Sequence, residues 1–156
     1  MRILDFGIRI ADLGLEDDVK GALKMNAEEM KTRTKEFAKD IINLCRKLPN
    51  NREGRLIGNQ VFKSGTSVAA NYRAACRGRS KAEFIAKLGI VEEEADETLF
   101  WLEVIEEMNI YDPSSVDSLM QECDEIIAIM VSSVKTAKQT RKQTLINPQS
   151  ELHNDS

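Results

Sequence analysis

The stretch from Ser64 to Glu103 constrains the fold of this chain more than any other segment. A segment rich in small residues leads into the basic run RGRSK at residues 77–81, and a strongly acidic segment follows. Ser80 and Glu83 have the spacing of a capping box, in which each side chain bonds the backbone N–H of the other residue at the start of a helix. We therefore predict two helices that are joined by a well-defined turn.

The small-residue segment contains Gly65 in its interior and Gly78 just beyond its end. An interior glycine makes a helix less stable than alanine would, by about 1 kcal/mol, so we expect close packing at Gly65. Gly78 has the position of a C′ residue, where a left-handed backbone is common. In the acidic segment, apolar residues at steps of three and four predict a helix face that packs on a core. They are Phe84, Leu88, Val91, Ala95, Leu99 and Leu102.

The same periodicity extends over most of the chain. Apolar residues at helical spacing predict four helices, at about residues 27–48, 55–77, 81–109 and 113–140. Pro49 follows the first helix, and Asp112-Pro113 resembles an N-cap followed by a first helical residue. Four helices with short connections are typical of a bundle in which successive helices alternate in direction. The predicted fold class is all-α, an antiparallel up-down-up-down four-helix bundle.

The length of 156 residues is sufficient for a single domain with a sizeable core. We predict the bundle over residues 27–140, a flexible N-terminal extension over residues 1–26 and a polar, disordered tail over residues 141–156. Met25 is an alternative start, which would make the preceding residues an extension or a cloning remnant. A partner-binding tail is the other interpretation of this segment.

The N-terminal residues and the cysteines indicate where the protein works. No apolar run approaches the length of a membrane span, and charged residues interrupt the segment in which a signal peptide would need an apolar run. Cys45, Cys76 and Cys123 are scattered, and each falls within a predicted helix. An odd number of separated cysteines indicates buried, reduced thiols. We therefore expect a cytoplasmic protein that has no membrane partner.

Opposite charges are concentrated in neighbouring parts of the sequence. The formal net charge is −4, which argues against a global basic field that recruits nucleic acid. Residues 52–81, however, contain seven Lys and Arg against one acid, and residues 84–112 contain nine acids against one Lys. Two solvated helix faces of opposite charge explain this distribution most simply.

Signatures of catalysis and of metal binding are missing from the sequence. A di-iron site in a bundle needs Glu-x-x-His on two helices, and the only histidine is His153 in the predicted tail. A zinc site fails for the same reason and because the cysteine spacing does not match one. The sequence contains neither a Ser/His/Asp arrangement within the bundle nor a phosphate-binding loop. We therefore predict that the protein is not an enzyme, with no catalytic residues and no cofactor.

The acidic helix supports one alternative interpretation. Glu93 and Asp96 lie on one helix face, with Glu97 beside them. All-α nucleotide pyrophosphohydrolases hold Mg²⁺ with Glu-x-x-Glu and Glu-x-x-Asp pairs on helices of a bundle, and hard oxygen ligands suit this ion. A metal-dependent enzyme of that kind is therefore the alternative. Because a second convincing pair is missing, we favour an acidic face that pairs with basic residues of a neighbouring helix or subunit.

Four cations form a basic patch at the turn, namely Arg73, Arg77, Arg79 and Lys81. Arg73 and Arg77 are four residues apart on one helix face, and the other two extend the patch into the turn. Guanidinium groups suit phosphate contacts, which need no base readout. Our hypothesis is that nucleic acid binds here, and salt bridges between helices or subunits are the alternative. The next candidate is a second basic stretch, made of Lys135, Lys138, Arg141 and Lys142.

Short segments between Gln60 and Glu103 carry a resemblance to a known family. They are Ala69-Ala70-Asn71, the RGRSK turn, Glu83-Phe84 and the ending Trp101-Leu102-Glu103. The earlier segment TKEFA, at residues 34–38, adds to them. Over about residues 30–140 the chain resembles the four helix bundle protein family. This family is also called the 23S rRNA-intervening-sequence protein family, and its members are sometimes labelled as ribosomal proteins.

The resemblance implies an antiparallel four-helix bundle that assembles into a homopentameric ring in the bacterial cytoplasm. A relative, the accessory variability determinant of diversity-generating retroelements, is a basic pentameric barrel that contacts nucleic acid and a reverse transcriptase. This chain differs from that relative in being acidic overall. Its opposed basic and acidic segments would allow subunits to pair head to tail. We therefore expect a homo-oligomeric binding or scaffold protein, with RNA or DNA and a protein such as a reverse transcriptase as further partners.

Overall fold

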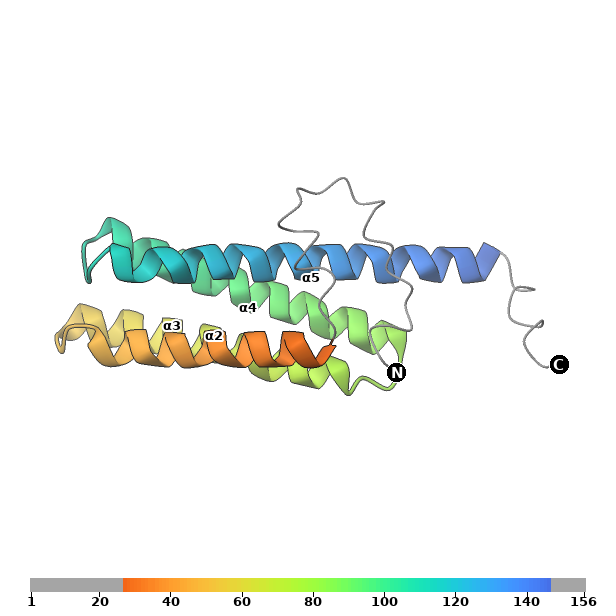
Figure 1. Cartoon of the computed structure of the whole chain (residues 1–156), viewed down its shortest axis with the longest axis horizontal. Helices are drawn as coiled ribbons and strands as arrows, with labels where there is room; N and C mark the ends of the chain where they lie inside the picture. Colours follow the sequence, from red (N-terminus) through yellow and green to blue (C-terminus); the bar gives the residue numbers. More distant parts are fainter. Residues whose placement is uncertain (1–26, 147–156) are drawn as a thin grey trace.

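The computed structural model describes residues 27–146, with side chains as far as residue 139. Four helices account for most of this range, and no β-strand occurs within it (Figure 1). They are α2 (Ala27–Lys47), α3 (Arg52–Cys76), α4 (Lys81–Glu107) and α5 (Ser114–Ile146). The predicted all-α class with four helices is therefore confirmed. The predicted N-terminal extension, 1–26, and residues 147–156 of the predicted tail lie outside the described residues.

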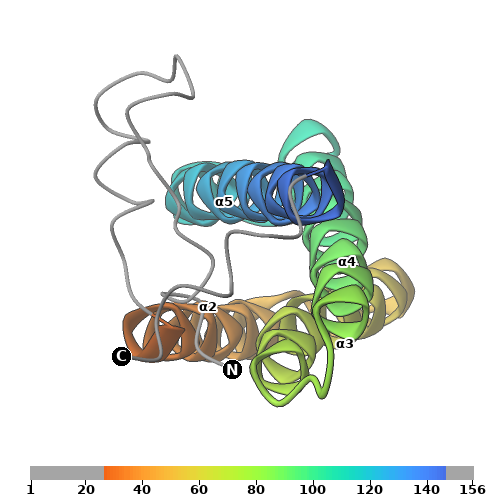
Figure 2. The ribbon, with the colours of Figure 1, turned by 90° about the vertical axis from the view of Figure 1, so that its right-hand side faces the viewer.

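Each helix packs along the next one in the chain, and the contact between α2 and α5 is less extensive than these (Figure 2). The turns after α2 and after α4 lie at one end of the molecule, here called the two-turn end (Figure 1). The turn after α3 lies at the opposite end, here called the one-turn end. Within the described range, none of the helices combines the length and the apolarity that crossing a membrane requires.

Helix α3 begins at Arg52, earlier than predicted, because Asn51 caps it. The Asn51 side chain accepts a hydrogen bond from the backbone N–H of Gly54 at 2.8 Å. Such a cap satisfies one of the backbone donors that the first turn of a helix leaves without an intrahelical partner. The short connection of residues 48–51 therefore follows the end of α2 and also supplies the cap of α3.

Helix α5 continues past the predicted boundary at residue 140 and ends at Ile146. The first residues of the predicted polar tail, 141–146, are thus helical, and this segment contains neither Gly nor Pro. The next residue, Asn147, precedes Pro148, and the residue before a proline is disfavoured in the helical conformation.

The turn between α3 and α4 contains the predicted cap. Ser80 is the N-cap of α4, and its hydroxyl accepts a hydrogen bond from the Glu83 backbone N–H at 3.1 Å. The Glu83 carboxylate accepts a hydrogen bond from the backbone N–H of Arg79 at 2.9 Å. In a capping box this second bond would come from the N-cap residue itself. The cap is confirmed, with its reciprocal bond shifted by one residue.

The prediction that Gly78 is the C′ residue of α3 is confirmed, although its backbone is not left-handed. A Cβ atom at Gly78 would lie 3.1 Å from the carbonyl oxygen of Ala75 and 3.3 Å from the backbone nitrogen of Phe84. The start of α4 thus lies very close to the end of α3. A glycine fits here because of this close approach.

A left-handed residue caps the end of α4. Asn109 has a φ of 51°. Its N–H donates to the carbonyl of Glu106, and the N–H of Ile110 donates to the carbonyl of Ile105, both at 3.0 Å. These two bonds make a Schellman motif, which satisfies the carbonyl groups at the end of a helix.

Close packing at Gly65 is confirmed. A Cβ atom there would lie 2.8 Å from both Cγ1 and Cγ2 of Ile41 on α2. At Gly58, two turns earlier, a Cβ atom would lie 3.2 Å from Cδ1 of Leu48. The Gly58 carbonyl also accepts a hydrogen bond from the Cys45 thiol at 3.5 Å. The glycines of α3 therefore let its backbone approach α2.

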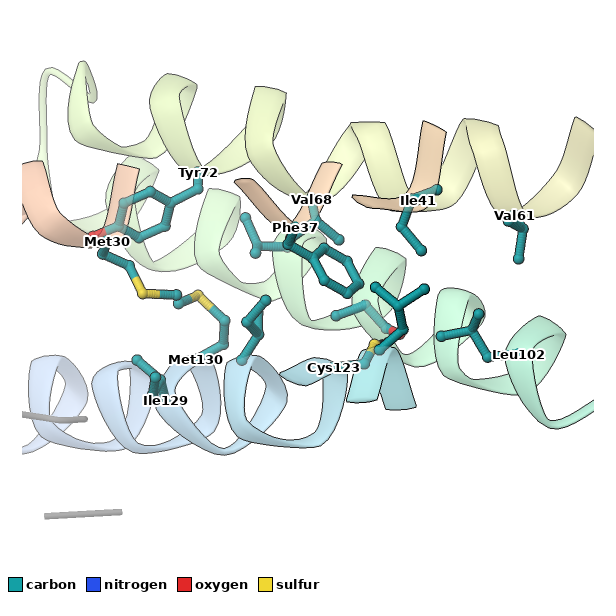
Figure 3. Close-up of a cluster of buried hydrophobic side chains, with 14 of the residues drawn as sticks. Met30, Phe37, Ile41, Val61, Val68, Tyr72, Leu102, Cys123, Ile129 and Met130 are labelled. Carbon is teal, nitrogen blue, oxygen red and sulfur yellow. Dashed lines mark hydrogen bonds between the residues drawn. The ribbon is translucent and has the colours of Figure 1, made fainter. Parts of the chain in front are cut away.

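A continuous apolar core runs between the four helices, and Figure 3 shows part of it. Its largest fully buried side chains are Tyr72, Phe37, Ile41, Leu88, Leu102, Ile105, Ile126, Met130, Val61, Val68, Val91 and Val116. The predicted apolar face of α4 is buried except for Leu99, which is half-buried. Thr98 lies in the core next to it, and its hydroxyl donates to Ser64 Oγ of α3 at 2.9 Å. A buried polar contact thus joins α3 to α4.

An ion-pair cluster joins α2 to α5. Nε of Arg33 lies 2.6 Å from Oε1 of Glu122, and Nη2 lies 2.7 Å from Oε2 of the same residue. The guanidinium also bonds the carboxylate of Glu125. Because the Arg33 side chain is only 17% exposed, solvent screens this cluster less than it screens a surface pair.

All three cysteines lie in helices as free thiols. Cys45 and Cys76 are half-buried, and Cys123 is buried and donates to the carbonyl oxygen of Ala95 at 2.9 Å. Burial raises the pKa of Cys45 to about 11 and that of Cys123 to about 12. These thiols therefore stay protonated at neutral pH and are poor nucleophiles.

Candidate nucleic-acid interface

The predicted basic patch lies at the one-turn end, around the turn between α3 and α4 (Figure 1). Arg73 is in the last turn of α3, and Arg77 is its C-cap, with φ −100° and ψ 5°. Arg79 lies in the turn, and Lys81 is the first residue of α4. Hydrogen bonds of 3.1 and 3.0 Å tie the backbone N–H groups of Arg77 and Gly78 to the last turn of α3. The structure therefore brings all four cations to one end of the bundle.

The three arginines of this patch are exposed, and Lys81 is half-buried. No ion pair joins Arg73, Arg77 or Arg79 to a carboxylate in the part of the chain that the structure describes. Salt bridges between helices, the alternative role for these arginines, are therefore not found within this part of the monomer. Their guanidinium groups are therefore not paired with any carboxylate of the described residues.

Glu83, the acid closest to the turn in sequence, is engaged by other groups. One of its oxygens accepts the hydrogen bond from the Arg79 backbone, and the other lies 4.0 Å from Nζ of Lys87. Its negative charge is therefore shared with a backbone dipole and a lysine. The arginine side chains keep their positive potential.

The carboxylates of the alternative interpretation, Glu93, Asp96 and Glu97, are exposed on α4. Between residues 27 and 139, no group of three or more His, Cys, Asp and Glu side chains lies close enough together to hold a metal ion. Residues that share a face along one helix do not converge on a point unless a second helix supplies facing ligands. These carboxylates also form no ion pair with a described residue, so the expected pairing with a neighbouring helix is not found.

The pKa of Glu94 shows how burial and neighbouring carboxylates act on a charged group of α4. Burial raises the pKa of the Glu94 carboxyl above its ordinary value, and repulsion from Glu97 and Glu93 raises it further. Lys63 of α3 acts in the opposite direction but does not cancel these effects. Among the described residues, the cations near Glu94 therefore do not offset the burial and the repulsion that act on it.

A second candidate site, at the two-turn end, was missed by sequence reasoning. A cavity of about 320 Å³ lies at the turn between α2 and α3. Arg46 and Arg55 border it, and Leu48, Pro49 and Phe62 contribute apolar surface. No motif joins these residues, because they come from two helices and the turn between them. The available signal was Phe62, a large apolar residue outside the apolar stripe of its helix.

The second basic stretch is described only in part. Lys135 and Lys138 are exposed on α5. Arg141 and Lys142 fall in the last turns of that helix, where the structure describes no side chains. These two residues therefore stay a prediction.

Comparisons with known proteins match most of the four-helix unit. A family model described as 23S rRNA-intervening sequence protein matches residues 27–132, from the start of α2 into α5. A crystal structure of a protein of unknown function from the S23 ribosomal protein family of Bacteroides thetaiotaomicron is similar, with a TM-score of 0.65 and 34% sequence identity. This similarity covers 70% of the present chain and 97% of the other. No curated protein is significantly similar to this chain.

Proposed function

Because this chain belongs to the 23S rRNA-intervening sequence protein family, we propose that it is an oligomeric binding or scaffold protein without enzymatic activity. Successive helices of the bundle alternate in direction, and copies of the chain assemble into a ring in the cytoplasm. The number of subunits, five, rests on the family resemblance. The ring contacts RNA or DNA weakly through the basic patch formed by Arg73, Arg77, Arg79 and Lys81.

The single observation that supports the nucleic-acid contact is the arrangement of the three arginines, Arg73, Arg77 and Arg79. They are exposed, they are gathered at one turn, and none of them pairs with a carboxylate of the described chain. A guanidinium group can bind two phosphate oxygens at once through parallel N–H bonds. Contacts to phosphate fix the position of a nucleic acid but read no sequence, so binding is independent of sequence.

Assembly would compensate for the small size of the patch. The patch of one copy contains only four cations, and the formal net charge of the chain is −4. A ring repeats the patch, so that several weak contacts act on one nucleic acid and raise the overall affinity. The proposed contact therefore depends on the proposed ring.

A fluorescence-polarisation titration tests the contact. The assembled protein is titrated against structured RNA, single-stranded DNA and duplex DNA at salt concentrations between about 50 and 200 mM, a range over which counterion release weakens phosphate contacts steeply. We expect binding at low salt that falls steeply with salt and is lost in the Arg77→Ala/Arg79→Ala variant. The control variant, Lys135→Ala/Lys138→Ala, removes two exposed cations from α5 and should bind like the original chain.

Two outcomes contradict the nucleic-acid contact. If none of the three nucleic acids binds at low salt, the partner is a protein. If the control variant loses binding and the Arg77→Ala/Arg79→Ala variant keeps it, the site lies on α5.

Light scattering tests the assembly. The support for a homo-oligomer is electrostatic: the carboxylates Glu93, Asp96 and Glu97 of α4 lack ion-pair partners within the described chain, and head-to-tail contact with cations of another copy, outside the basic patch, would supply them. We expect a mass several times that of the 17.6 kDa chain at micromolar concentration. A monomer mass over the whole concentration range contradicts assembly.

A further inference from the structure

Phe100 and Trp101 form an aromatic ridge on the outside of α4. Their ring centroids are 4.9 Å apart, with an interplanar angle of 70°. Trp101 is half-buried against the core, whereas Phe100 is 52% exposed. Aromatic residues are enriched at protein–protein interfaces relative to the rest of the protein surface.

Three carboxylates surround Phe100 on the helix surface. Asp96 and Glu97 precede it by four and three residues, and Glu103 follows it by three, so all three are its neighbours on the surface of α4. Each is exposed, and none forms an ion pair with a residue that the structure describes. The aromatic ridge therefore has a negative rim.

The cavity at the turn between α2 and α3 has the opposite pattern. Leu48, Pro49 and Phe62 line it, and the Phe62 side chain is 45% exposed. Arg46 and Arg55 lie at its edge, and both are exposed. Their guanidinium groups bond only oxygens of nearby asparagines, and neither pairs with a carboxylate of the described chain. This arginine-rimmed cavity therefore combines a hollow apolar surface with positive charge.

We propose that the aromatic ridge of one copy of this chain enters the arginine-rimmed cavity of a second copy. Phe100 would pack against the exposed ring of Phe62, since aromatic rings prefer such edge or offset contacts. The carboxylates around the ridge would meet the two arginines, which gives the contact its orientation and excludes other pairings. Contact between two ridges is disfavoured, because it would bring the carboxylates of both copies together.

This contact is heterologous, because the ridge and the cavity are different surfaces of the chain. Heterologous contacts form a closed ring when the rotation between neighbours closes. The inference rests on the proposed assembly and names the surfaces that make it. It uses none of the arginines at the one-turn end, so an assembled protein would still present its basic patch to nucleic acid.

Two interface variants of the full chain and their mixture test this contact. Phe100→Glu removes the ridge, and Arg46→Glu/Arg55→Glu reverses the rim of the cavity. Because all three side chains are exposed, we expect the folded helical content to stay unchanged, which circular dichroism measures. Light scattering should show that each variant alone is a monomer. An equimolar mixture should form a 1:1 dimer with twice the monomer mass, because one intact ridge and one intact cavity remain.

Matched controls place the same charges elsewhere. Val131→Glu adds an acid at an exposed apolar position of α5, and Lys135→Glu/Lys138→Glu reverses two exposed cations of the same helix. Both controls should assemble like the original chain. If Phe100→Glu lowers the helical content, Phe100→Ala is used in its place. We then expect the variant assembly to dissociate at a protein concentration at least tenfold higher than the concentration at which the original assembly dissociates.

The outcomes separate this inference from the proposed assembly. If the original chain assembles and the interface variants assemble equally well, the contact lies elsewhere, and only this inference fails. If the variants are monomers and their mixture stays monomeric, the contact is not between a ridge and a cavity. If the original chain is itself a monomer, the assembly and this contact fail together.

Discussion

Gly65 of α3 lies so close to α2 that a Cβ atom in its place would be 2.8 Å from both Cγ1 and Cγ2 of Ile41. Ile41 is fully buried, and its branched side chain has few alternative rotamers. Because the surrounding core is closely packed, Ile41 cannot move aside without displacing its neighbours. This pair of residues therefore sets the distance between the two helices.

Gly65→Ala should lower the free energy of unfolding by about 1–2 kcal/mol, because the cost of overpacking exceeds the gain in helix propensity. Urea denaturation followed by circular dichroism measures this loss. Gly89→Ala is the matched control, since it lies within α4 and a Cβ atom there would meet nothing within 4 Å. It should stabilise the protein by up to about 1 kcal/mol. A gain in stability for Gly65→Ala would show that the two helices can separate at little cost.

The buried hydroxyls of Thr98 and Ser64 should be coupled in stability. Thr98→Val keeps the shape of the side chain and removes its hydrogen bond to Ser64, and we expect a loss of about 1 kcal/mol. The loss stays small because the Ser64 hydroxyl keeps a second partner, the carbonyl of Gln60 at 3.0 Å. The double variant Thr98→Val/Ser64→Ala should lose less than the two single variants together. Strictly additive losses in urea denaturation would show that the two hydroxyls do not interact.

Arg33 should contribute more to stability than the surface ion pairs of the same helix. Arg33→Gln leaves the carboxylates of Glu122 and Glu125 facing each other without a cation, so we expect a loss of about 1–3 kcal/mol, less than for a fully buried pair. Lys39→Gln, the control, breaks an exposed pair with Glu36, which costs about 0.5 kcal/mol or less. Thermal unfolding at two salt concentrations compares the stability losses of the two variants. Equal effects would mean that the Arg33 cluster is screened like a surface pair.

Local patterns explain which parts of this fold could be predicted. The cap at Ser80 and the close packing at Gly65 follow from residue types at fixed spacing along one helix, and both are found. The role of Gly78 could not be derived in this way, because it depends on how close the backbone of Phe84 lies. The cap at Asn51 was missed because a segment that ends one helix was not also recognised as the start of the next.

The same distinction applies to the candidate sites. The patch around Arg77 was predictable because its residues lie close together in sequence and surround one turn. A metal site needs ligands from several helices, and the spacing of Glu93 and Asp96 along one helix says nothing about what faces them. The cavity beside Arg46 and Arg55 depends on how α2 and α3 pack near their shared turn, which no local pattern contains.

The buried thiol of Cys123 should make the protein less stable in alkaline solution. Burial raises its pKa to about 12, so the folded state keeps the proton at pH values where the unfolded state, with a thiol pKa of about 8.5, releases it. The contribution of this thiol to stability is complete below the unfolded pKa and is lost as the pH rises through the folded pKa. When the pH is raised from 8 to 10, the free energy of unfolding should therefore fall less in Cys123→Ala than in the original chain. The difference between the two decreases should be about 1–2 kcal/mol. Denaturation curves that shift equally with pH in both proteins would contradict this expectation.

The salt dependence of nucleic-acid binding should report how many subunits touch one ligand. The logarithm of the affinity for duplex DNA falls linearly with the logarithm of the salt concentration, with a slope of about −0.9 for each phosphate contact. Arg77→Ala removes one exposed guanidinium from every subunit, so each engaged subunit should reduce the slope by about 1. Lys135→Ala, which removes a cation from α5, should leave the slope unchanged. If polarisation titrations show that Arg77→Ala reduces the magnitude of this slope by more than 1, several subunits of a ring hold the same duplex. An unchanged slope would mean that Arg77 does not touch phosphate, whatever its effect on affinity.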